Sequence, residues 1–129
     1  MTDVPLQPAT ISIDPRKSRI RIHRTLLQLL GFPKYIQFLV NPNNKSMAIK
    51  RIEKPIAGMP CEKIKPQEFM INDSYELYSK SLVESLCRVY GKLNLNYTYH
   101  LTGEIVQSQR MAVFLPETLT RVECKEDEK

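Results

Sequence analysis

Two kinds of hydrophobic periodicity meet within 21 residues, between Ile11 and Gly31, and they constrain the fold more than any other feature of the chain. Ile20 and Ile22 alternate with arginines, which is typical of a strand with one buried and one exposed face. Directly afterwards, the leucine-rich run Leu26–Leu30 predicts a short helix, and Gly31 fits the left-handed position that ends a helix. We therefore expect short strands and short helices in close succession, as in an α+β fold.

Turn signals and further alternating segments divide the rest of the chain into short elements. Asp14–Ser18 is predicted as a turn, with its proline suited to the second position. Thr25 precedes Gln28 by three residues, and Ser81 precedes Glu84 by three, which is the capping-box spacing that starts helices. The remaining predicted elements are strands at 11–14, 19–22, 35–40, 46–52, 96–101 and 105–115, a turn at 102–103 and a second helix that ends at residue 90.

Both halves of the chain show a capped helix followed by a hairpin. One interpretation is a duplicated strand–helix–hairpin unit with a period near 56 residues. The other is that two small α+β segments are alike to this extent by chance. On the first interpretation the chain divides into a flexible N-terminus (1–10), a basic module (11–54), a connector (55–66), a second strand–helix–hairpin module (67–122) and a charged tail (123–129).

Charge is distributed unevenly along the chain. Up to Pro66, twelve lysines and arginines accompany four acidic residues, whereas from Gln67 onward seven accompany ten. The net charge of +5 therefore comes from the first half. This asymmetry indicates that one half contacts a polyanion and the other half contacts something else. The alternative is a chance distribution combined with an acidic tail.

Basic residues are concentrated around the first alternating strand. Five of them occur within nine residues, and the alternation places Arg19 and Arg21 on one face. Guanidinium groups suit phosphate oxygens and guanine edges, and a two-stranded ribbon fits a DNA major groove. With two residues of the returning strand, the candidate nucleic-acid-binding residues are Arg16, Lys17, Arg19, Arg21, Arg24, Lys50 and Arg51. The alternative is an ordinary solvated strand face.

The residues around the basic strand also follow an order found in a known family. They are Asp14, Arg19, Ile20, Ile22, Leu27, Leu30 and Gly31, followed by a hairpin. This order resembles the module of the swapped-hairpin transcription factors AbrB, MazE and MraZ, which combines D-x-x-G-R-[ILV]-x-[IL]-P with a short L-x-x-L-G helix. The resemblance covers residues 11–53, and the glycine and proline of the pattern are Ser18 and His23 here.

The resemblance implies a β-rich α+β fold of two similar strand–helix–hairpin units around a swapped-hairpin, barrel-type core. MraZ-like members carry two modules in one chain, which places a degenerate second copy at 71–122. The family binds double-stranded DNA through its basic strand and loop, and it forms dimers or higher rings. By this resemblance Arg16, Lys17, Arg19, Arg21 and Arg24 contact phosphates and bases, and the chain forms a homo-oligomer.

Other classes of protein find little support in the sequence. It contains no G-x-S-x-G, Walker or H-E-x-x-H motif, so we expect neither an enzyme nor a cofactor. Two histidines and three cysteines lack the spacing of a metal site. An odd number of cysteines suits a reducing compartment, and no apolar run is long enough to cross a membrane. These features predict a cytoplasmic protein without a metal site.

Two functions fit these observations. The first is a small cytoplasmic DNA-binding protein that regulates transcription through its basic strand and loop. The second is a non-enzymatic protein-binding module, such as an antitoxin or an inhibitor of a nucleic-acid enzyme. The tyrosines of the acidic second half could form a platform on which bases stack. The negative charge of that half argues against nucleic acid there and favours a protein partner, because tyrosine is enriched at protein interfaces. The tyrosines concerned are Tyr75, Tyr78, Tyr90, Tyr97 and Tyr99.

Overall fold

A computed structural model describes residues 9–59, 61–65, 74–91 and 93–123 of the chain. The expected flexible N-terminus and charged tail lie outside the described residues for the most part, as does Cys124. Where they are described, both segments belong to strands, because Ala9 and Thr10 are in the first strand and Glu123 is in the last.

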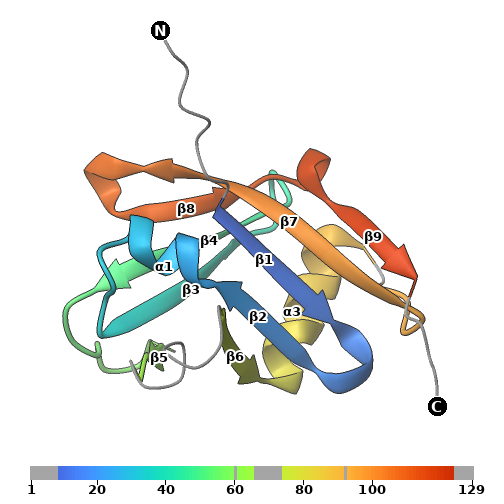
Figure 1. Ribbon diagram of the computed structural model, residues 1–129, viewed down its shortest axis with the longest axis horizontal. Helices are drawn as coiled ribbons and strands as arrows, with labels where there is room; N and C mark the ends of the chain where they lie inside the picture. The colour runs from blue at the N-terminus through green and yellow to red at the C-terminus, as the bar shows by residue number, and fades with distance from the viewer. Residues whose placement is uncertain (1–8, 60, 66–73, 92, 124–129) are drawn as a thin grey trace, which may run out of the picture.

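The described residues form nine strands, two α-helices and three 3₁₀ turns (Figure 1). The strands are β1 (Ala9–Asp14), β2 (Arg19–His23), β3 (Tyr35–Asn41), β4 (Ser46–Ile52), β5 (Glu62–Lys63), β6 (Ser74–Tyr78), β7 (Tyr97–Val106), β8 (Met111–Phe114) and β9 (Thr120–Glu123). The helices are α1 (Arg24–Leu29) and α3 (Lys80–Tyr90), and the 3₁₀ turns are η1 (Pro15–Lys17), η2 (Gln107–Gln109) and η3 (Pro116–Thr118). The chain is thus a β-rich α+β protein, as the sequence predicts.

All nine strands belong to one antiparallel sheet that curls into half a barrel (Figure 1). The strand order is β5-β3-β4-β8-β7-β1-β2-β6, and β9 pairs with β7. β7 has ten residues, so it pairs with β8 at one end and with β9 at the other. β5, β6 and β9, which have two, five and four residues, were not predicted.

Strands from the two halves of the chain pair with one another at three places in this sheet. β2 pairs with β6, β1 with β7 and β4 with β8. The order strand, helix, hairpin occurs twice, as β2-α1-β3-β4 and as β6-α3-β7-β8. One cluster of buried side chains contains residues from both halves. The two halves therefore share a hydrophobic core.

The apolar face of the sheet forms this core. Ile20 and Ile22 of β2 are fully buried, as predicted, and they lie opposite Ile13 and Ile11 of β1. Helix α3 adds Leu86, which is also fully buried, to the same cluster. Each such side chain contributes roughly 1.5–3 kcal/mol on burial. Because side chains alternate along a strand, this burial directs the polar residues in between to the other face.

Both helices begin before the residues that the capping-box spacing predicts. The N-cap of α1 is His23, without a side-chain hydrogen bond, and not Thr25. The N-cap of α3 is Ser79, whose hydroxyl accepts from the N–H of Leu82 at 3.2 Å, and not Ser81. The start of α1 is set by β2, which pairs with β6 up to His23 and leads directly into the helix.

The end of α1 is as predicted. Gly31 has a φ of 81°, and its N–H donates to the carbonyl of Gln28 at 3.0 Å. The N–H of Phe32 donates to the carbonyl of Leu27 at 2.7 Å. These two bonds form the Schellman motif that glycine favours at the end of a helix.

Gly103 shows that the turn predicted at 102–103 is wrong. This glycine lies inside β7, which continues to Val106, and it pairs with Phe114 of β8. A Cβ atom at this position would lie 2.7 Å from a ring carbon of Phe114. The glycine is therefore not part of a turn. It makes room inside the strand for a core aromatic ring that approaches closely.

The β1–β2 and β7–β8 hairpins turn in the same way. Each contains a 3₁₀ turn followed by one left-handed residue, with φ 51° at Ser18 and φ 52° at Arg110. The N–H of Ser18 donates to the carbonyl of Pro15 at 3.2 Å, and that of Arg110 donates to the carbonyl of Gln107 at 3.1 Å. Ser18 thus has the backbone conformation that glycine favours, at the position where the swapped-hairpin pattern has glycine.

We expect Gly103→Ala to lower the free energy of unfolding by about 1–3 kcal/mol, because the added methyl group overlaps the Phe114 ring in a packed core. Urea unfolding followed by circular dichroism measures the loss. In the double variant Gly103→Ala/Phe114→Leu, the smaller side chain at position 114 leaves room for the methyl group. The double variant should therefore lose less stability than the sum of the losses in Gly103→Ala and Phe114→Leu. Strictly additive losses would contradict this account of Gly103.

Candidate nucleic-acid interface

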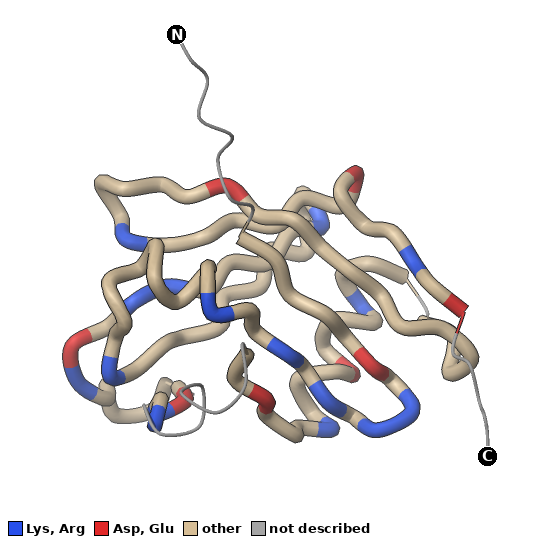
Figure 2. Tube along the Cα trace, viewed as in Figure 1, with Lys and Arg blue, Asp and Glu red and all other residues tan. Residues whose placement is uncertain are grey.

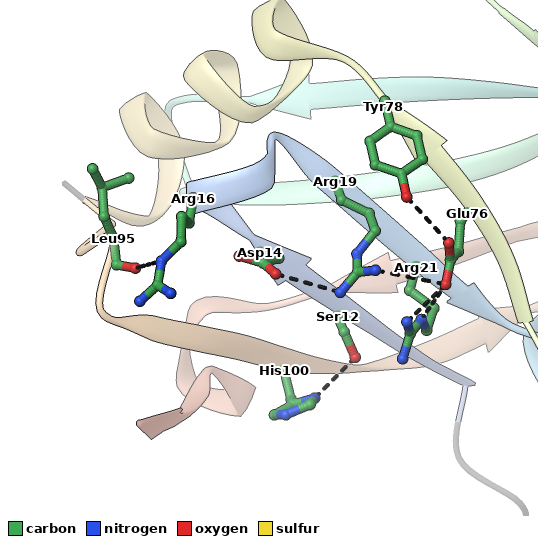
Figure 3. A network of polar contacts seen from close by, with 9 residues as sticks. All are labelled: Ser12, Asp14, Arg16, Arg19, Arg21, Glu76, Tyr78, Leu95 and His100. Atoms are coloured by element: carbon green, nitrogen blue, oxygen red, sulfur yellow. Dashed lines mark hydrogen bonds and ion pairs between the residues drawn. The ribbon is translucent and has the colours of Figure 1, made fainter. Parts of the chain in front are cut away.

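Polar side chains of β6, β2, β1, β7 and β9 share the sheet face opposite the core, which we call the open face. The strand register aligns them in rows. One row is Glu76, Arg21, Ser12, His100 and Thr120, each directly opposite the next. The next row contains Tyr78, Arg19 and Asp14. Figure 3 shows most of these side chains together, including the 3.0 Å contact between Ser12 Oγ and His100 Nδ1.

Arg19 and Arg21 lie side by side on the open face, as the alternation predicts, but both contact carboxylates of their own chain (Figure 3). Arg21 Nε and Nη2 donate to one oxygen of Glu76, Oε2, at 3.1 and 2.7 Å. Arg19 Nη2 donates to Asp14 Oδ2 at 3.3 Å, and Arg19 Nη1 lies 3.8 Å from Glu76 Oε2. Two cations thus meet two anions, which reduces the charge that these arginines can offer to phosphates.

Glu76 is the centre of this network. Its second oxygen, Oε1, accepts from the hydroxyl of Tyr78 at 3.3 Å. Burial raises the pKa of the Glu76 carboxyl. The hydrogen bonds and charge of Arg21, the charge of Arg19 and the Tyr78 hydroxyl lower this pKa, and together they outweigh the effect of burial. The pKa therefore lies below the ordinary value of a glutamate, and the carboxylate is ionised at neutral pH.

Asp14 is the more buried acid of the pair, with a side chain that is 10% exposed. Its Oδ1 is the one buried side-chain nitrogen or oxygen atom within the described part of the chain that has no hydrogen-bond partner. An uncompensated buried carboxylate is strongly destabilising, so the contact with Arg19 is needed to hold it. Arg19 thus stabilises the fold whatever else it binds.

A separate group of cations lies at the end of the β1–β2 hairpin. We call these cations, Arg16, Lys17 and Lys80, together with the turn residue Ser18 the hairpin tip. Arg16 and Lys17 are exposed, and Arg16 Nε donates to the carbonyl of Leu95 at 3.3 Å.

Lys80 joins the tip although it is distant in sequence. The N–H of Ser79 donates to the carbonyl of Ser18 at 2.9 Å, which brings the first residue of α3 beside the turn. No described carboxylate lies within ion-pair distance of Lys17 or Lys80. Figure 2 shows Lys and Arg positions following the end of this hairpin.

The other predicted residues form a second group. Lys50 and Arg51 are on β4, which β8, β7 and β1 separate from β2 in the sheet. Arg51 pairs with Glu53 at 3.0 Å and donates to the carbonyl of Leu30, near the end of α1, at 3.0 Å. Arg24 begins α1, and its guanidinium carbon lies 5.9 Å from the centre of the Phe32 ring. The seven predicted residues thus do not form one continuous patch: Arg16 and Lys17 lie at the hairpin tip, Arg19 and Arg21 lie on the open face, and the other three lie on α1 and β4.

Sequence reasoning missed Glu76 and Lys80, because it did not predict β6, and it named Tyr78 only as one of five tyrosines expected at a protein interface. A signal was present: Tyr75 and Leu77 are buried and alternate with the polar or exposed residues on either side. Five residues with this period were too short to separate from the connector before them.

The tyrosines expected at a protein interface have mainly structural contacts. Tyr75 is buried, and its hydroxyl lies 3.0 Å from Glu62 Oε2, which connects β6 to β5 at the two ends of the sheet. The hydroxyl of Tyr90 donates to the carbonyl of Phe114 at 2.8 Å, and burial raises the pKa of Tyr90 to about 12. Tyr78 is different, because it is 63% exposed.

Among the described residues, no group of three or more His, Cys, Asp and Glu side chains is placed to hold a metal ion. No helix in the same part of the chain has the length and apolar character needed to cross a membrane. Cys61 and Cys87 are free thiols and are partly buried.

No family model matches the chain, and it matches neither a curated protein nor a solved structure. We therefore infer its function from the residues and the geometry of this chain.

We expect Glu76→Gln to cost about 0.5 kcal/mol of stability at pH 7, because it removes a partly exposed ion pair but keeps the shape of the side chain. The folded-state pKa of Glu76 is depressed, so its contribution is present above the ordinary glutamate pKa of 4.5 and is lost as the pH falls through the folded-state value. Urea unfolding at pH 7 and pH 3 should show the two proteins converging at pH 3. A difference that is independent of pH would contradict this role of Glu76.

Proposed function

We propose that this chain is a small, cytoplasmic, non-enzymatic DNA-binding protein that regulates transcription, and that its hairpin tip meets duplex DNA. The observation that carries the proposal is the group of exposed cations at the tip, Lys17 and Lys80 beside Arg16. Lysine and arginine side chains that neutralise phosphates release counterions and supply most of the affinity for a duplex. Base contacts then add specificity.

The shape of the sheet supports the tip as the contact. Glu76, Arg21, Ser12, His100 and Thr120 span five strands, so the open face is about 19 Å wide at the usual strand spacing. The major groove of B-DNA is roughly 12 Å wide, which admits a two-stranded ribbon but not a face of this width. The β1–β2 hairpin by itself has the width of a two-stranded ribbon.

The surroundings of the tip keep a positive balance in spite of the ion pairs. Five cations and two carboxylates lie on the β1–β2 hairpin, on the adjoining β6 and at Lys80, the first residue of α3, which leaves a balance of +3. The residues counted are Arg16, Lys17, Arg19, Arg21 and Lys80 against Asp14 and Glu76. A local excess of this sign attracts a polyanion and speeds its association.

The resemblance to AbrB, MazE and MraZ supports the same function. Two strand–helix–hairpin series in one sheet fit two swapped-hairpin modules in one chain. We propose such a core, with Arg19, Arg21 and Arg24 as further contacts to phosphates outside the groove and Lys50 and Arg51 as a second site. A homo-oligomer would present several tips to one duplex and raise the affinity by their combined binding.

Charge reversal tests the tip. The double variant Lys17→Glu/Lys80→Glu should weaken duplex binding at least tenfold at 50 mM salt. It should also make the slope of log K against log salt concentration shallower by about 1.8, which corresponds to two lost phosphate contacts. Fluorescence anisotropy with a labelled duplex across a salt series measures both quantities. The matched control is Lys34→Glu/Lys54→Glu, which changes the net charge equally at two exposed positions away from the tip. Equal losses in the two variants would reject the tip as the DNA contact.

A protein-binding module is the second candidate, and one feature favours it. β3 pairs with β5 only at Tyr35 and Ile36, so in the described part of the chain no strand pairs with the rest of this edge. A cavity of about 280 Å³ beside it is lined by Phe38, Val40 and Leu82, among others. An exposed edge next to an apolar groove is the arrangement that accepts an added strand.

Val40→Asp tests this candidate, because a charge in the groove disfavours an apolar peptide without removing a core residue. If the chain acts through this groove, full-length wild-type protein should retain one specific partner that the variant loses. The duplex affinity of the variant should be unchanged. Retention of the same partner by both proteins would exclude the groove.

A further inference from the structure

We propose that the open face binds a single nucleic-acid strand with unpaired bases, and that one base stacks on Tyr78. This inference goes beyond the proposed function, because it assigns a second ligand to a surface other than the hairpin tip.

The ring of Tyr78 is available for stacking. It is 63% exposed and is the most exposed large hydrophobic side chain among the described residues. It lies on the edge strand β6, directly opposite Arg19, and its hydroxyl donates to Glu76 Oε1 at 3.3 Å (Figure 3). The hydrogen bond limits the motion of the ring but leaves its faces uncovered by this contact. Every base has a π-face, so stacking on such a ring tolerates any sequence.

The neighbouring arginines suit base edges better than phosphates. Arg21 uses Nε and Nη2 to hold Glu76 Oε2, which leaves further N–H groups of its guanidinium unused by this contact. Its side chain is 39% exposed. The ion pairs with Glu76 and Asp14 offset the charge of the arginines and weaken their attraction for phosphates, whereas base edges are uncharged and offer oxygen and nitrogen acceptors. A guanidinium held in one orientation loses less entropy when it makes such contacts.

The phosphates of a bound strand have a separate partner. Lys17 and Lys80 lie at the end of the hairpin that carries Arg19 and Arg21, so a strand stacked on Tyr78 can extend toward them. The open face thus combines an aromatic platform with nearby cations, which is the combination that binds unpaired strands. A paired duplex hides its bases inside the stack, and the face is too wide to enter a groove.

Fluorescence anisotropy with a labelled 12-nucleotide single strand and the corresponding duplex tests this inference. We expect Tyr78→Leu to weaken single-strand binding about tenfold, the size expected from the loss of one stacked base. Tyr78→Phe keeps the ring and should remain within threefold of the wild type. Both variants should bind the duplex within twofold of the wild-type affinity, because Tyr78 is not part of the tip.

The matched control is Phe32→Leu, which removes another exposed aromatic ring beside an arginine, Arg24, at the end of α1. It should leave single-strand binding unchanged. Circular dichroism and the urea midpoint show whether each variant is folded. A fall in affinity in Tyr78→Phe as large as in Tyr78→Leu would indicate that the hydroxyl and not the ring is needed, and would overturn the stacking role.

The two proposals fail separately. Single-strand binding that is absent, or that Tyr78→Leu does not change, overturns this inference even if duplex binding depends on Lys17 and Lys80. Single-strand binding that requires Tyr78, with duplex binding insensitive to Lys17 and Lys80, supports this inference and overturns the proposed duplex contact.

Discussion

The position of β2 inside the sheet is the constraint on which the remaining structure depends. β2 pairs with β1 on one side and β6 on the other, so it has no free edge, and its two isoleucines must enter the core. This fixes Arg19 and Arg21 on the open face and brings them within reach of β6. The strand also leads into α1 without a loop, so the register of β2 sets where the helix begins.

Pairing the arginines with acids changes what they can contribute. An unpaired arginine adds charge and therefore affinity, whereas one held by Glu76 or Asp14 adds mainly direction. The fold thus separates two tasks over a short distance. The lysines of the hairpin tip keep their charge, and the arginines behind them are oriented by hydrogen bonds.

Much of the fold could be predicted from local patterns, while the candidate site could not. The alternation of β2, the turn at η1, the strand β4 and the end of α1 at Gly31 all depend on neighbouring residues, and these predictions are confirmed. The ion pair between Arg21 and Glu76 joins residues 55 apart, and it exists because an unpredicted strand lies beside β2. Gly103 was misread for a similar reason, since the ring that requires a glycine belongs to another strand. Periodicity reports which face a residue occupies, but not which residue will face it.

The central place of β1 has a consequence for how the chain is made. Ser12 and His100, which face each other across β1 and β7, are 88 residues apart. During synthesis β1 can pair with β2 as soon as both strands have left the ribosome. Its other edge stays unpaired until β7, near the end of the chain, has also been synthesised. An apolar strand with an open edge is prone to associate with other chains, and pairs so distant in sequence form slowly. The fold therefore closes around its earliest described strand only when nearly all of its partners have been synthesised.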